Sequence, residues 1–232
     1  MSEFQLIEWL RSQQAMPADG VSLGIGDDAA VLQIPPGREL VVSTDTLNES
    51  VHFDSAIPPE MLGHKSLAVS LSDMAAMGAQ PAWALLSLSM PSVDQGWFEL
   101  FSKGFLQLAK TSGVSLVGGD TCSGNLSISV TVMGTVSAGK AMTRSGASPG
   151  DLLVVSGTLG DAALALARHL AGEPTKRSSL EPLYRPVPRV ALGQSLVGNA
   201  SACIDISDGL LADLGHVCRS SACGARIELE LL

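Results

Sequence analysis

The chain has 232 residues, of which 46% are hydrophobic and 16% charged, and its formal net charge is −9. At about 100–200 residues per domain, this length allows one large domain or two modest ones with an ample core. The apolar content excludes global disorder, and the negative charge opposes nucleic acid and anionic membranes as partners. No apolar run approaches the ~20 residues of a membrane span.

The N-terminal residues and the cysteines indicate a reducing compartment. Glu3 and Glu8 lie within a helical pattern, which is not typical of a secretory signal peptide. The four cysteines are spaced too loosely for a zinc site, which usually needs two tight pairs. We therefore expect free thiols in a soluble, cytoplasmic protein.

The first half of the chain predicts alternating helices and strands. In chain order we expect a helix over about 3–14, a glycine-aspartate loop at 23–28, strands near 29–34 and 39–44, a helix over 60–77, a strand over 82–90, a helix over 94–111, a short strand before Gly118 and a long alternating strand over 126–136. Pro58-Pro59 and Gly78 punctuate the ends of the first long helix. The aromatic stripe Trp97, Phe101 and Phe105 on the second long helix is typical of a core-facing surface.

The second half predicts a further unit that looks cut short. After a turn-rich stretch at 145–150, the patterns predict a strand over 152–155, a helix over 161–170, an exposed proline-rich loop over 172–189, helices near 188–198 and after Gly209, and a strand-like alternation over 225–232. The predicted fold class is thus mixed α/β (α+β), with an N-terminal α/β domain over 1–140 and an incomplete C-terminal α/β domain over 148–232.

Aspartates stand at apolar or glycine-rich positions of this charge-poor chain. They are Asp27 and Asp28 after Gly-x-Gly, Asp45 at a strand end, Asp73 in an apolar helix, Asp120 after Gly118-Gly119, and Asp205 and Asp208 around Ile206-Ser207. Taken singly, each is explained by ordinary turn chemistry, and Ser207 and Asp208 by a helix N-cap. No basic residue on the predicted helix is spaced to pair with Asp73.

Taken together, the aspartates indicate a hard divalent cation bound through oxygen. Converging carboxylates repel one another, and few Lys or Arg residues stand near them to compensate. The hydroxyls of Ser43, Thr44 and Ser207 are further oxygen ligands in the same segments. A magnesium site in turn favours phosphate chemistry, because Mg²⁺ commonly joins protein carboxylates to substrate phosphates.

Two basic side chains have both a functional and a structural interpretation. Arg144, before a Ser-Gly turn, is spaced to hold a phosphate, or is an ordinary surface arginine. His52 follows a predicted strand and is either a site residue or a packed strand-end histidine.

Several common nucleotide-binding classes are excluded by their motifs. The chain contains neither the phosphate-binding motif G-x-x-x-x-G-K-[ST] nor the H-R-D and D-F-G motifs of protein kinases. A dinucleotide fingerprint at Gly24-x-Gly26 is rejected, because a strand follows and Asp27-Asp28 would repel a pyrophosphate.

The ordered motifs closely resemble those of thiamine-monophosphate kinases. They are GIGDDAA at 24–30, STDT at 43–46, HF at 52–53, SDMAAMGA at 72–79, GGDT at 118–121, TRSGA at 143–147, GD at 160–161 and DISDGL at 205–210. The resemblance runs from about residue 3 to the last residue. Relatives in the wider aminoimidazole-ribonucleotide-synthetase-like superfamily share the same plan of metal-binding aspartates.

The resemblance implies ATP-dependent phosphorylation of thiamine monophosphate to thiamine diphosphate, with Mg²⁺ and without a catalytic side chain. It implies metal ligation by Asp28, Ser43, Thr44, Asp45, Asp73, Asp120, Asp205 and Asp208. It implies ATP contacts at Gly119, Asp120, Arg144 and Ser207, and a position near the thiamine phosphate for His52. The implied fold is an α/β unit whose sheet forms a homodimer, followed by a C-terminal α/β domain.

The resemblance also leaves alternatives open. Family members are expected to continue for roughly another ninety residues, within the usual domain scale, and that part helps to bind the thiamine moiety. The alternatives are therefore a non-catalytic Mg·nucleotide-binding and dimerisation module, or a superfamily relative that uses another ATP-activated substrate.

Overall fold

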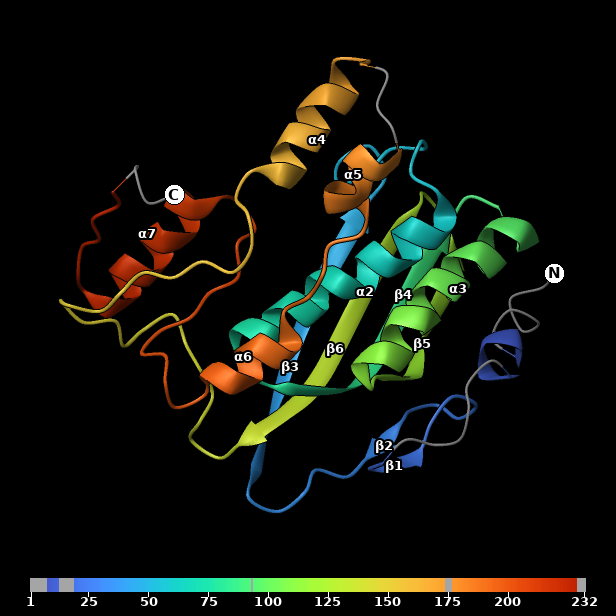
Figure 1. The fold of residues 1–232 in the computed structure, drawn as a ribbon. Helices are drawn as coiled ribbons and strands as arrows, with labels where there is room; N and C mark the ends of the chain where they lie inside the picture. The colour runs from blue at the N-terminus through green and yellow to red at the C-terminus, as the bar shows by residue number, and fades with distance from the viewer. Residues whose placement is uncertain (1–7, 13–18, 93, 174–176, 229–232) are drawn as a thin grey trace.

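A four-stranded sheet forms the centre of the molecule (Figure 1). The computed structural model describes residues 8–12, 19–92, 94–173 and 177–228. The strands are β3 (Arg38–Asn48), β4 (Gln80–Met90), β5 (Ser115–Ser123) and β6 (Ser127–Ser137), in the order β3-β6-β4-β5. Strand β6 is antiparallel to both of its neighbours, whereas β4 and β5 are parallel. The parallel pair is possible because the helix between β4 and β5 carries the chain back to the end of the sheet at which β4 begins.

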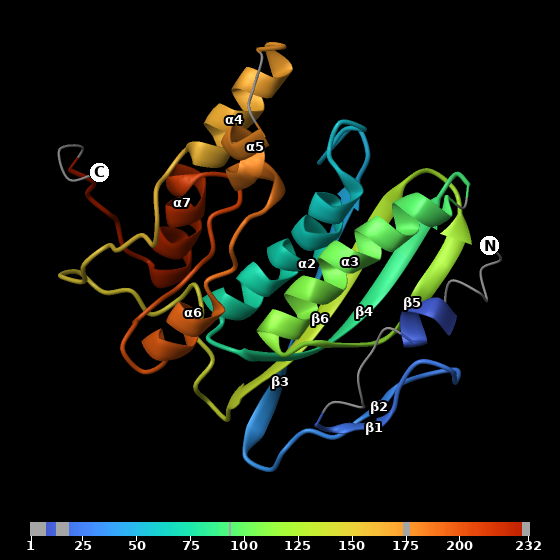
Figure 2. The same cartoon turned by 45° about the vertical axis from the view of Figure 1, so that its right-hand side comes forward.

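Two long helices cover one face of this sheet, α2 (Pro59–Ala76) and α3 (Gln95–Ser112) (Figures 1 and 2). Pro59 stands at the first position of α2, where its missing N–H costs no hydrogen bond. The Asp94 side chain caps α3 by accepting from the Trp97 N–H at 3.0 Å. Gly113 ends α3 in the left-handed conformation, at φ 69°. Both helices agree with the predicted ranges to within a residue or two.

Glycines let the two helices approach at backbone distance. A Cβ added at Gly63 on α2 would lie 1.9 Å from the Phe101 carbonyl oxygen of α3. A Cβ at Gly104 on α3 would lie 1.8 Å from the Glu60 carbonyl oxygen of α2. Phe101 and Phe105, predicted for the core, are at most 1% exposed. The packing of α2 against α3 therefore depends on two positions that tolerate no side chain.

The N-terminal residues form a small unit beside the sheet. Residues 8–12 are helical, and the remainder of the helix expected over 3–14 lies outside the described residues. Strand β1 (Val21–Leu23) pairs with β2 (Val31–Leu32), so the strand expected over 29–34 is shorter than predicted. Gly20 lies against the Trp83 ring of β4, which joins this hairpin to the main sheet.

The second half consists of helices and irregular segments. They are α4 (Asp161–Leu170), α5 (Arg177–Tyr184), α6 (Val190–Leu196) and α7 (Leu210–Ser221). The strand predicted over 152–155 is wrong, since this segment has no strand partner among the described residues and Leu152 is 90% exposed. Residues 225–228 form no strand either, and 229–232 lie outside the described residues. Alternating apolar residues form a strand only where a neighbour accepts their backbone hydrogen bonds.

The exposed loop predicted over 172–189 is also wrong, because it contains α5. Pro182 and the polar composition argued against a helix. Leu180, Leu183 and Tyr184 nevertheless pack against the core of the first half. Tertiary packing thus overrides a weak local propensity.

No helix among the described residues is both long and apolar enough to cross a membrane. All four cysteines are free thiols, as the sequence predicts.

The helix contact generates a prediction about stability. Gly104→Ala is expected to lower the free energy of unfolding by about 2–4 kcal/mol, because the new methyl group has no space. Denaturant unfolding followed by circular dichroism measures the change. Gly96→Ala, on the same helix but 3.5 Å from its nearest neighbour atom, is the matched control. It is expected to be neutral or slightly stabilising, and equal stability of the two variants would contradict the proposed close contact.

Candidate functional site

A cavity of about 230 Å³ lies where β3, α2 and the segment around Cys203 meet. Four of the residues singled out from the sequence line it: Ser43, Asp73, Arg144 and Asp205. They come from a strand, a helix and two loops of the second half, which are far apart in the chain. The structure therefore brings together residues that the sequence could associate only by their chemistry.

The strand and helix place Ser43 and Asp73 in direct contact. Alternation along β3 directs Ser43 toward α2, and Asp73 stands in the last turns of that helix. The Ser43 hydroxyl donates a hydrogen bond to the Asp73 carboxylate. Asp45, two residues further along β3, faces the same side of the sheet.

The carboxylates in this cavity oppose one another. Burial raises the pKa of Asp73, and the Asp45 charge acts in the same direction, whereas the Ser43 hydrogen bond and Arg144 lower it. Burial also raises the pKa of Asp205, with Asp73 adding to the effect against a hydrogen bond from Ser72. The site thus holds negative charge that the protein compensates only partly.

The donor set fits a hard cation. Asp45 Oδ2 is buried and has no hydrogen-bond partner, although a carboxylate oxygen in that position strongly favours one. Together with Ser43, Asp73 and Asp205 it supplies only oxygen ligands, the type that Mg²⁺ prefers. Among the described residues, however, no three His, Cys, Asp or Glu side chains already stand close enough to enclose a metal ion. The arrangement suits a cation that also binds the ligand's oxygens.

Asp213, which the sequence analysis missed, shapes the loop that carries Asp205 and Ser207. The residue is 5% exposed, and its carboxylate accepts the backbone N–H groups of residues 207, 208 and 209 at 2.9, 3.1 and 3.1 Å. The N-cap of α7 is Gly209, without a side-chain cap bond, so the N-cap interpretation of Ser207 and Asp208 is wrong. An acidic residue in the first turn of the predicted helix was the available signal.

Other residues from the sequence analysis lie outside this cavity. Thr44 and Asp120 point from the opposite, uncovered face of the sheet, where Thr44 Oγ1 lies 2.8 Å from Thr131 Oγ1 and Asp120 pairs with Ser87. Gly119, beside Asp120, packs on the Leu86 backbone, where a Cβ would lie 1.8 Å from the carbonyl oxygen.

The remaining candidates are dispersed and exposed: Asp28 in the loop after β1, His52 in the loop after β3, and Asp208 before α7. Ser207 is closer to the cavity, with its Oγ 3.5 Å from Asp205 Oδ2. Within one chain, these residues do not form a single cluster.

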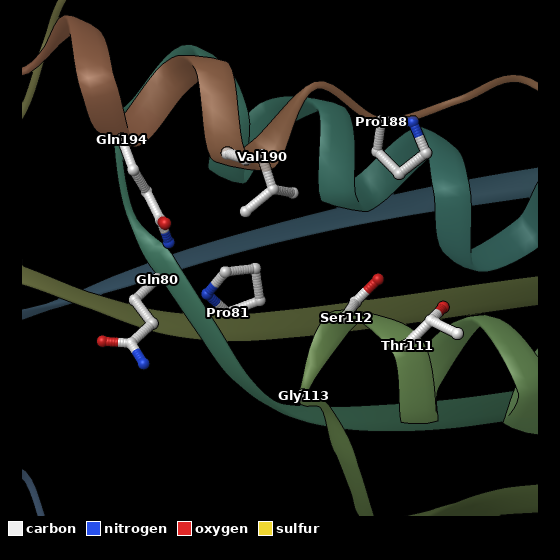
Figure 3. Close-up of a pocket in the computed structure, with 9 residues that line it drawn as sticks. Gln80, Pro81, Thr111, Ser112, Gly113, Pro188, Val190 and Gln194 are labelled. Atoms are coloured by element: carbon white, nitrogen blue, oxygen red, sulfur yellow. The ribbon is translucent and has the colours of Figure 1, made fainter.

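A second and larger cavity, of about 480 Å³, lies between the start of β4, the end of α3 and α6 (Figure 3). Gln80, Thr111, Ser112 and Gln194 supply its polar groups, and Pro81 and Val190 its apolar ones. None of its lining side chains ionises near neutral pH. The carboxylates and the arginine that the sequence analysis associates with phosphate chemistry line only the smaller of these two cavities.

Comparison with known proteins assigns both halves of the chain to one class. Residues 26–136 match the family described as AIR synthase related protein, N-terminal domain, and residues 148–232 match AIR synthase related protein, C-terminal domain. Hydrogenase maturation protein HypE, at 20–22% identity and TM-scores of 0.66–0.75, shares the fold. Fold and site thus define an AIR synthase related protein.

More similar relatives narrow this class. The thiamine-monophosphate kinases of Haemophilus influenzae and Escherichia coli K12 are each 46% identical over 236 and 235 residues, 100% and 99% of this chain and 72% of theirs. The crystal structure of the enzyme from Stenotrophomonas maltophilia K279a superposes with a TM-score of 0.86, at 46% identity, covering 96% of this chain and 73% of the other. AaThiL, solved in complex with AMPPCP and TMP, is 30% identical with a TM-score of 0.77, covering 95% and 70%. The chain belongs to the thiamine-monophosphate kinase family.

The opposed carboxylates generate a prediction about stability and binding. The pKa of Asp73 is higher in the folded protein than its ordinary value of 3.8. The free energy of unfolding is therefore largest at pH values below 3.8, where the carboxyl group is protonated, and it falls as the pH rises through the raised pKa. Asp73→Asn, which can still accept from Ser43, is therefore expected to raise the thermal midpoint of the metal-free protein at pH 7. The same variant is expected to bind Mg·ATP at least about tenfold more weakly, because even residues behind metal ligands change metal affinity 10- to 100-fold.

Asp151→Asn is the control, and it is expected to change the thermal midpoint in the opposite direction. Hydrogen bonds from the Ser201 hydroxyl and the Ser148 N–H lower the pKa of Asp151, so its loss is expected to destabilise at pH 7. Calorimetry in EDTA measures both midpoints. A lower midpoint for Asp73→Asn would contradict the repulsion inferred for the cavity.

Proposed function

We propose that this chain transfers the γ-phosphoryl group of ATP to thiamine monophosphate and forms thiamine diphosphate. The observation that carries the proposal is the cavity shared by Ser43, Asp73, Asp205 and Arg144, found in a chain of this family. AaThiL, a relative that is 30% identical, was solved with a thiamine monophosphate ligand and an ATP analogue, which supports the same pair of substrates here.

The chemistry of the acceptor requires no general base. The nucleophile is a phosphate oxygen that is already ionised at neutral pH. The obstacle is the repulsion between two polyanions, which positioning and charge neutralisation overcome. Mg²⁺ held by Ser43, Asp45, Asp73 and Asp205 would supply that neutralisation. Arg144, an exposed cation beside Asp73, is suited to bind a nucleotide phosphate oxygen.

The other site assignments form part of the same proposal. Asp28, Thr44, Asp120 and Asp208 are assigned to metal ligation, Gly119, Asp120 and Ser207 to ATP, and His52 to thiamine monophosphate. Their dispersal in one chain indicates that ligands, or a second chain, complete the site. The two domains proposed are residues 1–140 and 148–232.

The uncovered face of the sheet supports a homodimer. Leu40 and Val42 on β3 are 43% and 53% exposed, beside a ladder of hydroxyl groups that includes Thr44 and Thr131. Exposed apolar side chains on a wide sheet face are typical of a protein interface. Asp120 lies on this face, so a dimer formed through it would place Asp120 at the interface. Free cysteines agree with a cytoplasmic location.

The first test of the function is direct. The 232-residue chain, ATP, Mg²⁺ and thiamine monophosphate are expected to yield thiamine diphosphate, measured by chromatography. Asp45→Asn is expected to abolish the product and Mg-dependent ATP binding without loss of the fold, because it removes a buried oxygen ligand. Binding of Mg·ATP without product would instead identify a nucleotide-binding module, and product with another phosphate acceptor alone would identify a different kinase. Unchanged ATP binding by Asp45→Asn would contradict the metal assignment.

The test of the dimer uses one exposed residue of the sheet. Leu40→Glu places a charge on the uncovered face and is expected to shift the protein from dimer to monomer in sedimentation experiments, because a buried unpaired charge opposes association. Ile34→Glu, at a residue that is 41% exposed but outside the sheet, is the matched control. A wild-type protein that is monomeric at high concentration would disprove the proposed dimer.

A further inference from the structure

The loop between β3 and α2, residues 49–57, presents His52 to solvent. The Asn48 carbonyl oxygen accepts the N–H groups of Val51 and His52 at 3.2 and 2.9 Å, and Ser50 adopts a positive φ of 64° within this tight turn. His52 Nδ1 in turn accepts the Asn48 N–H at 3.0 Å. The neutral ring therefore carries its proton on Nε2, which is left to donate to a ligand.

Two side chains from outside the loop hold it in place. Lys65 on α2 donates from Nζ to the His52 carbonyl oxygen at 3.2 Å. His169 on α4 places Nε2 2.6 Å from Asp54 Oδ2, although the two residues are 115 positions apart. The loop is thus attached both to the first half of the chain and to the second.

The surroundings of His169 fix the direction of its ring. Its side chain is 21% exposed and lies edge-on to Tyr184 of α5, with ring centroids 6.3 Å apart and planes at 75°. Tyr184 is itself 5% exposed and packs in the core. By contrast, Ala165 is the only buried residue of α4. Most of α4 therefore has little buried surface to hold it in place, and the contacts of His169 are a main attachment of this helix to the rest of the chain.

The surroundings of the contact with Asp54 differ from those of an ordinary surface pair. Exposed ion pairs usually contribute little, because both side chains are mobile and hydrated. Here one partner is mostly buried and held by an aromatic ring. The hydrogen bond with His169 is the main cause that lowers the pKa of Asp54. Asp54 Oδ1 also accepts the Ala56 N–H at 3.0 Å, so the carboxylate joins α4 directly to the backbone of the loop.

We propose that the pair His169–Asp54 is a positioning contact for the acceptor substrate: it holds the 49–57 loop so that His52 meets thiamine monophosphate, and it couples α4 to acceptor binding. This proposal rests on the function proposed above, which assigns His52 to the acceptor. Nucleotide binding is independent of the contact, because the carboxylate cavity lies further back along β3. Asp45 and Asn48 are separated by about 10 Å at the rise of an extended strand.

Steady-state kinetics with each substrate varied in turn test the proposal. His169→Phe keeps an aromatic ring against Tyr184 and removes the hydrogen bond to Asp54. It is expected to raise the KM for thiamine monophosphate about five- to tenfold, the scale of one charged hydrogen bond, with the KM for ATP unchanged. Asp54→Asn/His169→Phe is expected to be no worse than His169→Phe alone, since both changes break one contact.

Arg168→Gln is the matched control on the same helix. Arg168 pairs with Glu173 at 3.8 Å, within the second half, and touches no residue of the loop in any ion pair that the structure shows for the described residues. Both KM values are expected to stay at the wild-type level. A His169→Phe enzyme with an unchanged KM for thiamine monophosphate, or with both KM values raised equally, would overturn the proposal.

Hydrogen exchange separates failure of this proposal from failure of the proposed function. Amides of residues 49–57 are expected to exchange faster in His169→Phe than in the wild type or in Arg168→Gln, whether or not the chain turns over. A wild type that forms no thiamine diphosphate would refute the proposed function and, with it, the coupling to the acceptor. Unchanged exchange in the loop would refute the positioning contact itself.

Discussion

The seating of α2 against the edge strand β3 is the constraint on which both the cavity and the loop after β3 depend. Gly63 and Gly104 allow α2 and α3 to touch at backbone distance, and a methyl group at either position would displace α2. That position brings Asp73 to Ser43 in the middle of β3, and Lys65 to the His52 carbonyl in the loop that follows the strand. One helix–strand contact thus aligns the proposed nucleotide and acceptor positions.

The carboxylates of the cavity are only partly compensated by other groups of the protein. Asp73 and Asp205 have raised pKa values because burial and neighbouring carboxylates disfavour their ionised forms, and Asp45 has a buried oxygen without a partner. A structural role would favour amides or an added cation at these positions. Groups that destabilise the free protein but suit a cation and a polyphosphate are typical of a binding site.

The second half of the chain contacts the first at the middle of β3 and at the loop that follows this strand. Arg144 and Asp205 complete the carboxylate cavity, while His169 of α4 holds Asp54 beyond the far end of the strand. Between these contacts Leu180, Leu183 and Tyr184 of α5 pack against the core of the first half. The strand predicted over 152–155 is unpaired, and so is the described part, 225–228, of the strand predicted over 225–232. The second half is therefore held to the first by apolar packing of α5 and α6, and it reaches the site through a few polar contacts.

The sequence by itself determined the parts of the protein that depend on neighbours close in the chain. The periodicity and caps of α2 and α3, the alternation of β6 and the ordered aspartate motifs predicted the first half and the family, because these signals are local. Only the tertiary structure decided that Asp205 joins Asp73 while Asp120 lies on the opposite face, that Asp213 anchors the loop before α7, and that α5 forms despite Pro182. The physical reason is that carboxylate repulsion, strand pairing and burial depend on residues brought together from distant segments, and a strand such as 152–155 does not form without a partner, whatever its own pattern.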